Sequence, residues 1–197
     1  MVRDILLIGD PVLFQVSNPV ERPTEERIAT LAKDMRETLE AANAIAVAAP
    51  QLGNLDRVIV FHLPEDRIPA GAKTAPIPWT AMVNPELEML SDSEQMLWER
   101  CLSIPNCYAR IRRRTLVRVR YQDLDGHRRE IVGSGYLAAL LQHEYDHLDG
   151  VLYPMRMRDG REMAAVSVVC GKERIYRYSP SDFDGVQPPF SDADKLK

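Results

Sequence analysis

A histidine-containing segment late in the chain is the feature that most constrains its fold. The sequence HEYDH occupies residues 143–147, after apolar turns over residues 137–141 and before Gly150. In an α-helix, residues four positions apart lie on one face, so His143 and His147 can reach one metal ion. Burying two imidazoles without partners costs free energy, and a metal ion would satisfy both. The pattern predicts a buried metal-binding helix that ends near Gly150. The alternative is a pair of histidines that are hydrogen-bonded in a core or exposed on its edge.

The carboxylate inside this segment predicts the chemistry. Glu144 is rotated away from the line of the two histidines, so it can reach a metal-bound water without coordinating the metal. A divalent metal ion lowers the pKa of its water towards neutrality, and a nearby carboxylate can carry the proton to a leaving group. The segment therefore predicts a metal-dependent hydrolase with Glu144 as the proton-transfer group.

Such a site needs a third ligand, and the sequence offers several candidates. One class of zinc proteases continues as HExxHxxGxxH, and this chain follows it through Gly150 but has Tyr153 in place of the last histidine. A phenol is a poor ligand at neutral pH. In another class a downstream glutamate completes the site, and Glu162 or Glu173 has a suitable spacing without a convincing helix. Cys101, in the strand-like WERCLSIP, would complete a tetrahedral site with one open position, so it is our expected ligand.

The remaining pattern predicts an α+β fold. Thr24-Glu25-Glu26 opens a helix with apolar residues at helical spacing from Ile28 to Ala42. Short β-rich segments separated by turn residues come next, and the histidine helix comes after them. This order favours antiparallel strands packed around a central metal-binding helix. We expect a catalytic domain over residues 1–158 and a C-terminal extension of unknown role over residues 159–197, with the strand-like ERIYRY.

Composition excludes several classes of protein. The chain has 197 residues, 45% hydrophobic and 27% charged, which is typical of one globular domain. A net charge of -4 argues against a DNA-binding protein, and no apolar run approaches the roughly 20 residues of a membrane span. Three cysteines suggest free thiols or metal ligands, with Cys170 a buried thiol. No signal peptide is visible, so we expect a cytoplasmic protein, or an organellar one if a transit peptide was removed.

Three segments together resemble the signature motifs of the peptide deformylases. They are AIAVAAPQ, ERCLS and QHEYDHLDG, in this order, and the similarity extends over about residues 4–157, from ILLIGDPVL to GVLYPMR. The resemblance implies a peptide-deformylase-like fold. It also implies hydrolytic removal of the N-formyl group from the first methionine of new polypeptides.

The resemblance also implies residue roles. Cys101, His143 and His147 would bind one divalent metal ion, typically ferrous iron, replaceable by zinc, nickel or cobalt. Glu144 would be the general acid and base, while the Gln51 side chain and the Leu102 backbone N–H would donate to the developing oxyanion. The peptide would pair along AIAVAAPQ and ERCLS, with its methionine in a pocket. The expected pocket residues are Ile45, Leu97, Tyr136, Ala139 and Leu140, each of them equally well explained as core.

Three positions depart from the family pattern. Ala44 and Ala46 replace glycines of the first motif, and Arg100 replaces the glycine before the cysteine of the second. Because glycine permits close backbone approach, these side chains are expected to narrow the substrate cleft around Ala46 and Arg100. We expect an active deformylase. The alternatives are a metal-binding relative with a changed substrate or little activity, and an HExxH metalloprotease.

One basic cluster suggests a second partner. Arg110, Arg112, Arg113 and Arg114 lie shortly after the second motif. They could contact ribosomal RNA, where a deformylase would meet its substrates. The acidic chain and the strand-like alternation favour a solvated strand edge instead.

Overall fold

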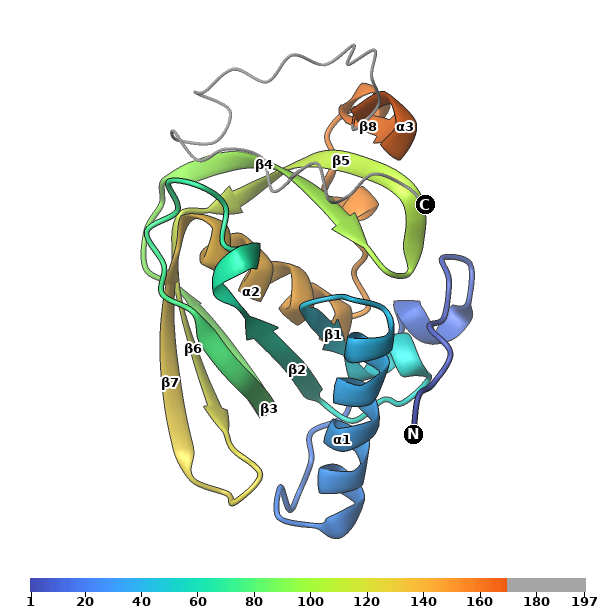
Figure 1. Ribbon diagram of the computed structural model, residues 1–197, viewed down its shortest axis with the longest axis vertical. Coiled ribbons are helices and arrows are strands. Elements are labelled where there is room, and N and C mark those ends of the chain that lie inside the picture. The colour runs from blue at the N-terminus through green and yellow to red at the C-terminus, as the bar shows by residue number, and fades with distance from the viewer. Residues whose placement is uncertain (170–197) are drawn as a thin grey trace.

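The computed structural model describes residues 1–169 and shows two antiparallel sheets on either side of helix α2 (Figure 1). The helices are α1 (Glu26–Ala41), α2 (Gly135–Leu148) and the short α3 (Val166–Val169). The strands are β1 (Ala46–Ala48), β2 (Val58–Leu63), β3 (Ile77–Met89), β4 (Glu94–Cys101), β5 (Ile104–Arg114), β6 (Leu116–Gln122), β7 (Arg128–Ser134) and β8 (Met163–Ala165). The predicted α+β class with a central helix is confirmed.

Each sheet has two edge strands, and one edge strand of each sheet leads to residues of the predicted site. One sheet has the order β1-β2-β3-β6-β7 and the other β4-β5-β8, with every neighbouring pair antiparallel. Within residues 1–169, β1 and β4 are therefore edge strands, each paired on one side only. The end of β1 leads into the turn that holds Gln51, and β4 ends at Cys101.

Helix α2 is the core of the molecule. Ten of its fourteen residues are buried, as expected for a helix covered by sheets on two sides. Leu137, Ala138 and Leu141 pack in one cluster with Phe61 and Met82 of the larger sheet. Its opposite side faces β4 and β5 and carries the histidines. Burial on both sides thus fixes the position of the histidines relative to β4.

Helix α1 covers the other face of the larger sheet. Ile28, Met35 and Leu39 form a cluster with Val47 and Val58, so the predicted apolar stripe is confirmed. The exception is Ala42, which comes after the helix as its C-cap residue and is exposed.

The segment after residue 158 is continuous with the smaller sheet. Strand β8 pairs with β5, and Val169 of α3 packs with Leu97, Trp98 and Tyr108. The described part of the expected extension thus lies against the smaller sheet, and the boundary at residue 158 stays a prediction. The predicted strand ERIYRY and Cys170 lie outside the described residues. In the described part of the chain, no helix is long and apolar enough to span a membrane.

Candidate active site

The three predicted ligands come together in the core. The ligand atoms of Cys101, His143 and His147 all lie within 4.8 Å of one another, and all three residues are buried. The Cys101 Sγ lies 3.2 Å from the His147 Nε2. Cys101 is the last residue of β4 and the histidines are one turn apart on α2, so the packing of strand against helix creates this cluster.

The donor atoms suit a divalent metal ion. The His143 Nδ1 lies 2.8 Å from the Glu99 carboxylate, so this nitrogen carries the hydrogen and Nε2 offers its lone pair. His147 directs Nε2 at Cys101, and its buried Nδ1 has no hydrogen-bond partner among residues 1–169. One sulfur and two imidazole nitrogens are a ligand set for iron or zinc with one position left open.

The same cluster favours a thiolate. Burial raises the pKa of the Cys101 thiol, but the neighbouring His147 and His143 outweigh this effect and hold the pKa well below its usual value. Burial lowers the pKa of His143, and its hydrogen bonds to Cys101 and Glu99 nevertheless bring that pKa well above the ordinary one. A negative sulfur among buried imidazoles is an environment that a divalent cation can enter and neutralise.

Glu144 lies beside the cluster without belonging to it. Its side chain is buried, and its Oε2 has no hydrogen-bond partner in the part of the chain that the structure describes. Burial raises the pKa of its carboxyl, although the two histidines act in the opposite direction. A carboxyl with a raised pKa and an oxygen without a partner among the described residues is suited to accept and return a proton.

Two N–H donors adjoin the same cluster. Gln51 lies in the turn after β1, where its Oε1 accepts from the Ala48 N–H at 2.9 Å. Its Nε2 donates to the Ser103 Oγ at 3.1 Å and to the Cys101 Sγ at 3.4 Å, so the NH₂ group faces the cluster. Leu102 begins the tight turn between β4 and β5, and its N–H donates to no described residue.

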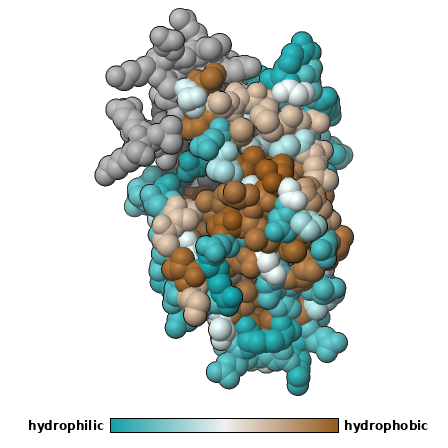
Figure 2. Space-filling model, turned by 90° about the vertical axis from the view of Figure 1, so that its right-hand side faces the viewer, coloured by the Kyte–Doolittle hydropathy of each residue, from teal (hydrophilic) through white to brown (hydrophobic). Residues whose placement is uncertain are grey.

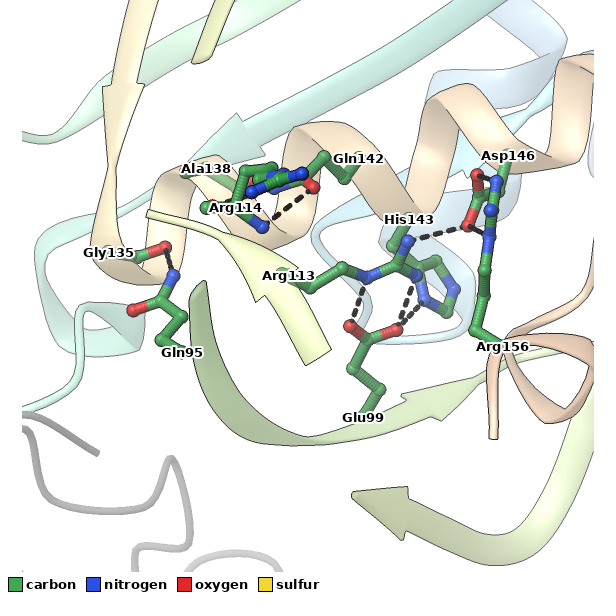
Figure 3. A network of polar contacts seen from close by, with 10 residues as sticks. All are labelled: Gln95, Glu99, Arg113, Arg114, Gly135, Ala138, Gln142, His143, Asp146 and Arg156. Atoms are coloured by element: carbon green, nitrogen blue, oxygen red, sulfur yellow. Dashed lines mark hydrogen bonds and ion pairs between the residues drawn. The ribbon is translucent and has the colours of Figure 1, made fainter. Parts of the chain in front are cut away.

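A network of ion pairs adjoins the ligand cluster at His143 (Figure 3). Arg113 binds both oxygens of Glu99, at 2.6 and 2.9 Å, and contacts Asp146 at 2.6 Å. Arg156 binds Asp146 from the other side, at 2.6 and 3.1 Å. Asp146 thus pairs with two arginines, and Glu99 is the residue that orients His143.

Glu99 is a site residue that the sequence reasoning missed. Its signal was its position two residues before Cys101 in a strand, because alternate residues of a strand face the same side. Arg113, expected on a solvated edge with its neighbouring arginines, is only 4% exposed. The prediction of a four-arginine surface cluster is therefore wrong for Arg113, since the pairing of β4 with β5 brings its side chain into the core beside Glu99.

The expected pocket residues lie on both sides of α2. Ile45 and Leu140 are partly buried against the main core, while Leu97 and Ala139 are buried in the cluster that contains Val169. Ala46 is buried on β1, and Arg100 is exposed on β4. Burial raises the pKa of Tyr136 to about 12, with opposing effects from the nearby Arg100 and Arg67.

The other candidate ligands lie elsewhere. The Tyr153 hydroxyl donates to the Cys107 carbonyl at 3.2 Å, and Glu162 lies in a separate short helix and binds the Arg158 N–H. Glu173 lies outside the described residues. Asp123, Asp125 and His127 form a second group of possible ligands in the exposed β6–β7 turn, where Asp123 is paired with Arg129.

The ionic network predicts an acid-sensitive fold. Burial raises the pKa of Glu99, but the charge and hydrogen bonds of Arg113, with that of His143, lower it from 4.5 to about 2. Because the unfolded chain binds the proton first, the free energy of unfolding of the metal-free protein should fall between about pH 4.5 and about pH 2. Urea unfolding over this range should show a weaker pH dependence in Glu99→Gln. The same change at the exposed Glu88 is the control, and equal slopes in Glu99→Gln and the unmodified protein would contradict the assignment.

The similarity of this chain to known proteins extends over all residues of this site. A family model described as polypeptide deformylase matches residues 2–163. The chain is 40% identical to peptide deformylase 2 of Ralstonia nicotianae over 160 residues, covering 81% of this chain and 89% of the relative. It is 42% identical to a peptide deformylase of Roseiflexus castenholzii over 168 residues, covering 80% of this chain and 90% of the relative.

Solved structures give the same picture. The peptide deformylase of Ehrlichia chaffeensis in complex with actinonin has a TM-score of 0.74 and 31% identity, covering 82% of this chain and 91% of that one. A Met-Ala-Ser-bound class I type b peptide deformylase from Acinetobacter baumannii has a TM-score of 0.72 and 31% identity, covering 80% of this chain and 99% of that one. The family model spans every residue of the site described above.

Proposed function

The chain belongs to the polypeptide deformylase family, metal-dependent hydrolases that remove the formyl group from the first methionine of new polypeptides, and we propose that Cys101, His143 and His147 hold its metal ion. The observation that carries this assignment is the convergence of one sulfur and two imidazoles within 4.8 Å in the core. We propose ferrous iron, the typical metal of the family, as the physiological ion. Zinc, nickel or cobalt can replace it, because the thiolate and imidazoles suit each of them. When bound, the ion supplies Lewis-acid activation of the formyl group and of water.

Glu144 is the proposed proton carrier. Its unpartnered Oε2 takes a proton from the attacking water and returns it to the nitrogen that leaves as the new N-terminal amine. As the formyl carbon becomes tetrahedral, its oxygen gains negative charge. The Gln51 Nε2 and the Leu102 N–H are the proposed donors to that oxygen.

The proposed peptide site is the space between the open edges of β1 and β4. An extended peptide can add to such edges through backbone hydrogen bonds. Two related structures, one bound to Met-Ala-Ser and one in complex with actinonin, support a peptide-like ligand. The proposed pocket for the methionine side chain consists of Ile45, Leu97, Tyr136, Ala139 and Leu140. The ribosome surface is a second proposed partner, in the cytoplasm or in an organelle with its own ribosomes.

Loss of the sulfur ligand tests the metal assignment. Cys101→Ser should lower the bound iron or nickel from about one ion per chain to about a tenth or less, because a serine hydroxyl is a weak ligand. Elemental analysis measures this, and Cys107→Ser is the matched control that should keep its metal. A metal content unchanged in Cys101→Ser would support a different third ligand, as in a metalloprotease.

Turnover tests the activity itself. The full chain, loaded anaerobically with ferrous iron or nickel, should release formate from a formyl-methionyl tripeptide. Absence of formate from folded, metal-replete protein would rule out the proposed activity.

The Arg100 side chain is expected to obstruct part of the path by which the peptide substrate reaches the site. The Arg100 side chain lies on the edge strand beside Cys101, at the position of the family's glycine. If this side chain weakens substrate binding by about 1 kcal/mol, Arg100→Gly should raise kcat/KM about fivefold. Steady-state kinetics with the tripeptide measure the change. Arg112→Gly, at an exposed position of β5, controls for the effect of glycine in a strand. An unchanged kcat/KM would mean that Arg100 points away from the peptide.

A further inference from the structure

The N-terminal arm (residues 5–17) is hydrogen-bonded to all three motif segments of the site. The Leu6 N–H donates to the Gln51 carbonyl at 2.8 Å, and the Ile8 N–H donates to the Ser103 carbonyl at 2.8 Å. Further on, the Ser17 N–H donates to the Leu148 carbonyl at the end of α2, at 2.7 Å. One short stretch of backbone thus joins segments that are about 50 residues apart in sequence.

The arm is held in place by packing as well. Leu13 is 1% exposed and belongs to the cluster of buried residues that contains Cys101 and Leu152. Where the arm passes the end of α2, an added Cβ on Gly150 would lie only 2.6 Å from the Phe14 carbonyl group. Four apolar side chains of the arm are exposed: Leu7, Ile8, Phe14 and Val16. Figure 2 shows one face of the molecule with a broad apolar surface. The arm is therefore fixed from its inner side.

The first two contacts lie beside the proposed oxyanion donors. Gln51 is bound through its own carbonyl by Leu6, while its side-chain amide is held by the Ala48 N–H and the Ser103 Oγ. Ser103, held by Ile8, comes directly after Leu102. Two residues of extended backbone span at most about 7 Å, so the Leu6–Ile8 spacing limits the separation of the two bound carbonyls.

We propose that Leu6 and Ile8 are positioning residues, whose backbone N–H groups set the relative placement of the Gln51 and Leu102 donors. The inference rests on the proposed role of these donors. Oxyanion stabilisation depends on donors fixed before the reaction, and small misplacements are costly. Loosening the arm should therefore lower kcat and leave metal binding intact.

Proline substitutions test this because proline lacks the N–H. In nickel-loaded full-length protein, Leu6→Pro and Ile8→Pro should each lower kcat about tenfold or more while KM stays within about twofold. Leu7→Pro is the matched control, because the Leu7 N–H donates to no residue in the range 1–169. Metal content and thermal unfolding are measured for all three variants. An equal loss of kcat in Leu7→Pro, or no loss in Leu6→Pro and Ile8→Pro, would overturn the proposal.

A double-mutant cycle distinguishes a positioning role of Leu6 from a general destabilisation of the fold. If Leu6 acts through Gln51, Leu6→Pro should change kcat by less than about twofold in a Gln51→Ala background. If the double variant lost kcat by the product of the two single-variant factors, the proposal would be overturned. If Gln51→Ala itself had full activity, the proposed donor would be wrong, and the inference would fall with it.

Amide hydrogen exchange in the unmodified protein is a second test, which does not require the proline variants to fold. In the unmodified protein the Leu6 and Ile8 amides should exchange slowly and the Leu7 amide quickly. Equal fast exchange at all three amides would overturn the proposal.

Discussion

Glu144→Gln is expected to lower kcat by about 100- to 10,000-fold, the range associated with loss of a general acid or base. Glutamine keeps the size of the side chain but cannot take up and return a proton. Glu144 is buried beside the ligand cluster, and its Oε2 has no hydrogen-bond partner among the described residues, so the substitution breaks no contact of this oxygen there. Formate release from a formyl-methionyl tripeptide measures kcat.

Metal content distinguishes a proton carrier from a ligand. Glu144→Gln should keep about one ion per chain, because three other side chains supply the ligand set. Glu162→Gln makes the same change in a short helix away from the cluster and should leave kcat unaltered. If Glu144→Gln retained kcat within a few-fold of the unmodified enzyme, another group would have to carry the proton.

Gly150→Ala is expected to lower the free energy of unfolding by about 3 kcal/mol or more, well above a typical substitution. Gly150 has φ +70°, where a Cβ is strained, and an added Cβ would lie 2.6 Å from the backbone of Phe14. Backbone atoms cannot move aside as a flexible side chain can. Denaturant unfolding measures the change, and we expect the N-terminal arm to be displaced in any folded variant.

Gly53→Ala separates the strain of a positive φ from the steric contact with the arm. Gly53 has φ +76°, but the nearest atom to an added Cβ is a Leu6 side-chain carbon at an ordinary 3.7 Å. This variant should therefore lose only the conformational strain, about 1 kcal/mol. If both variants lost the same free energy, the contact of Gly150 with the arm would contribute nothing.

The sequence predicted the parts of the site that depend on local pattern. The spacing of His143 and His147 placed both on one helix face, and the chemistry of the candidates favoured Cys101 as their partner. The structure brings these three together. Gln51 and Leu102 came from the family resemblance alone, because an amide in a turn has no periodic signal.

The parts that were missed depend on tertiary packing. Glu99 and Arg113 are both charged, and a charged residue in a strand is normally exposed, so their burial as a pair became visible only when β4 was placed against β5 and α2. The hydrogen bonds of the arm to the site are made by backbone groups, which carry no residue identity. The cluster of Leu97 and Ala139 with Val169 depended on where the chain after residue 158 returns.

The open edges of β1 and β4 have a consequence for selectivity. Main-chain N–H and C=O groups recur about every 3.3 Å along any extended polypeptide, whatever its side chains. An enzyme that binds its peptide at these edges, as proposed, is indifferent to most later side chains, while the proposed methionine pocket distinguishes the first residue. Such tolerance is what a processing step shared by many different nascent proteins requires.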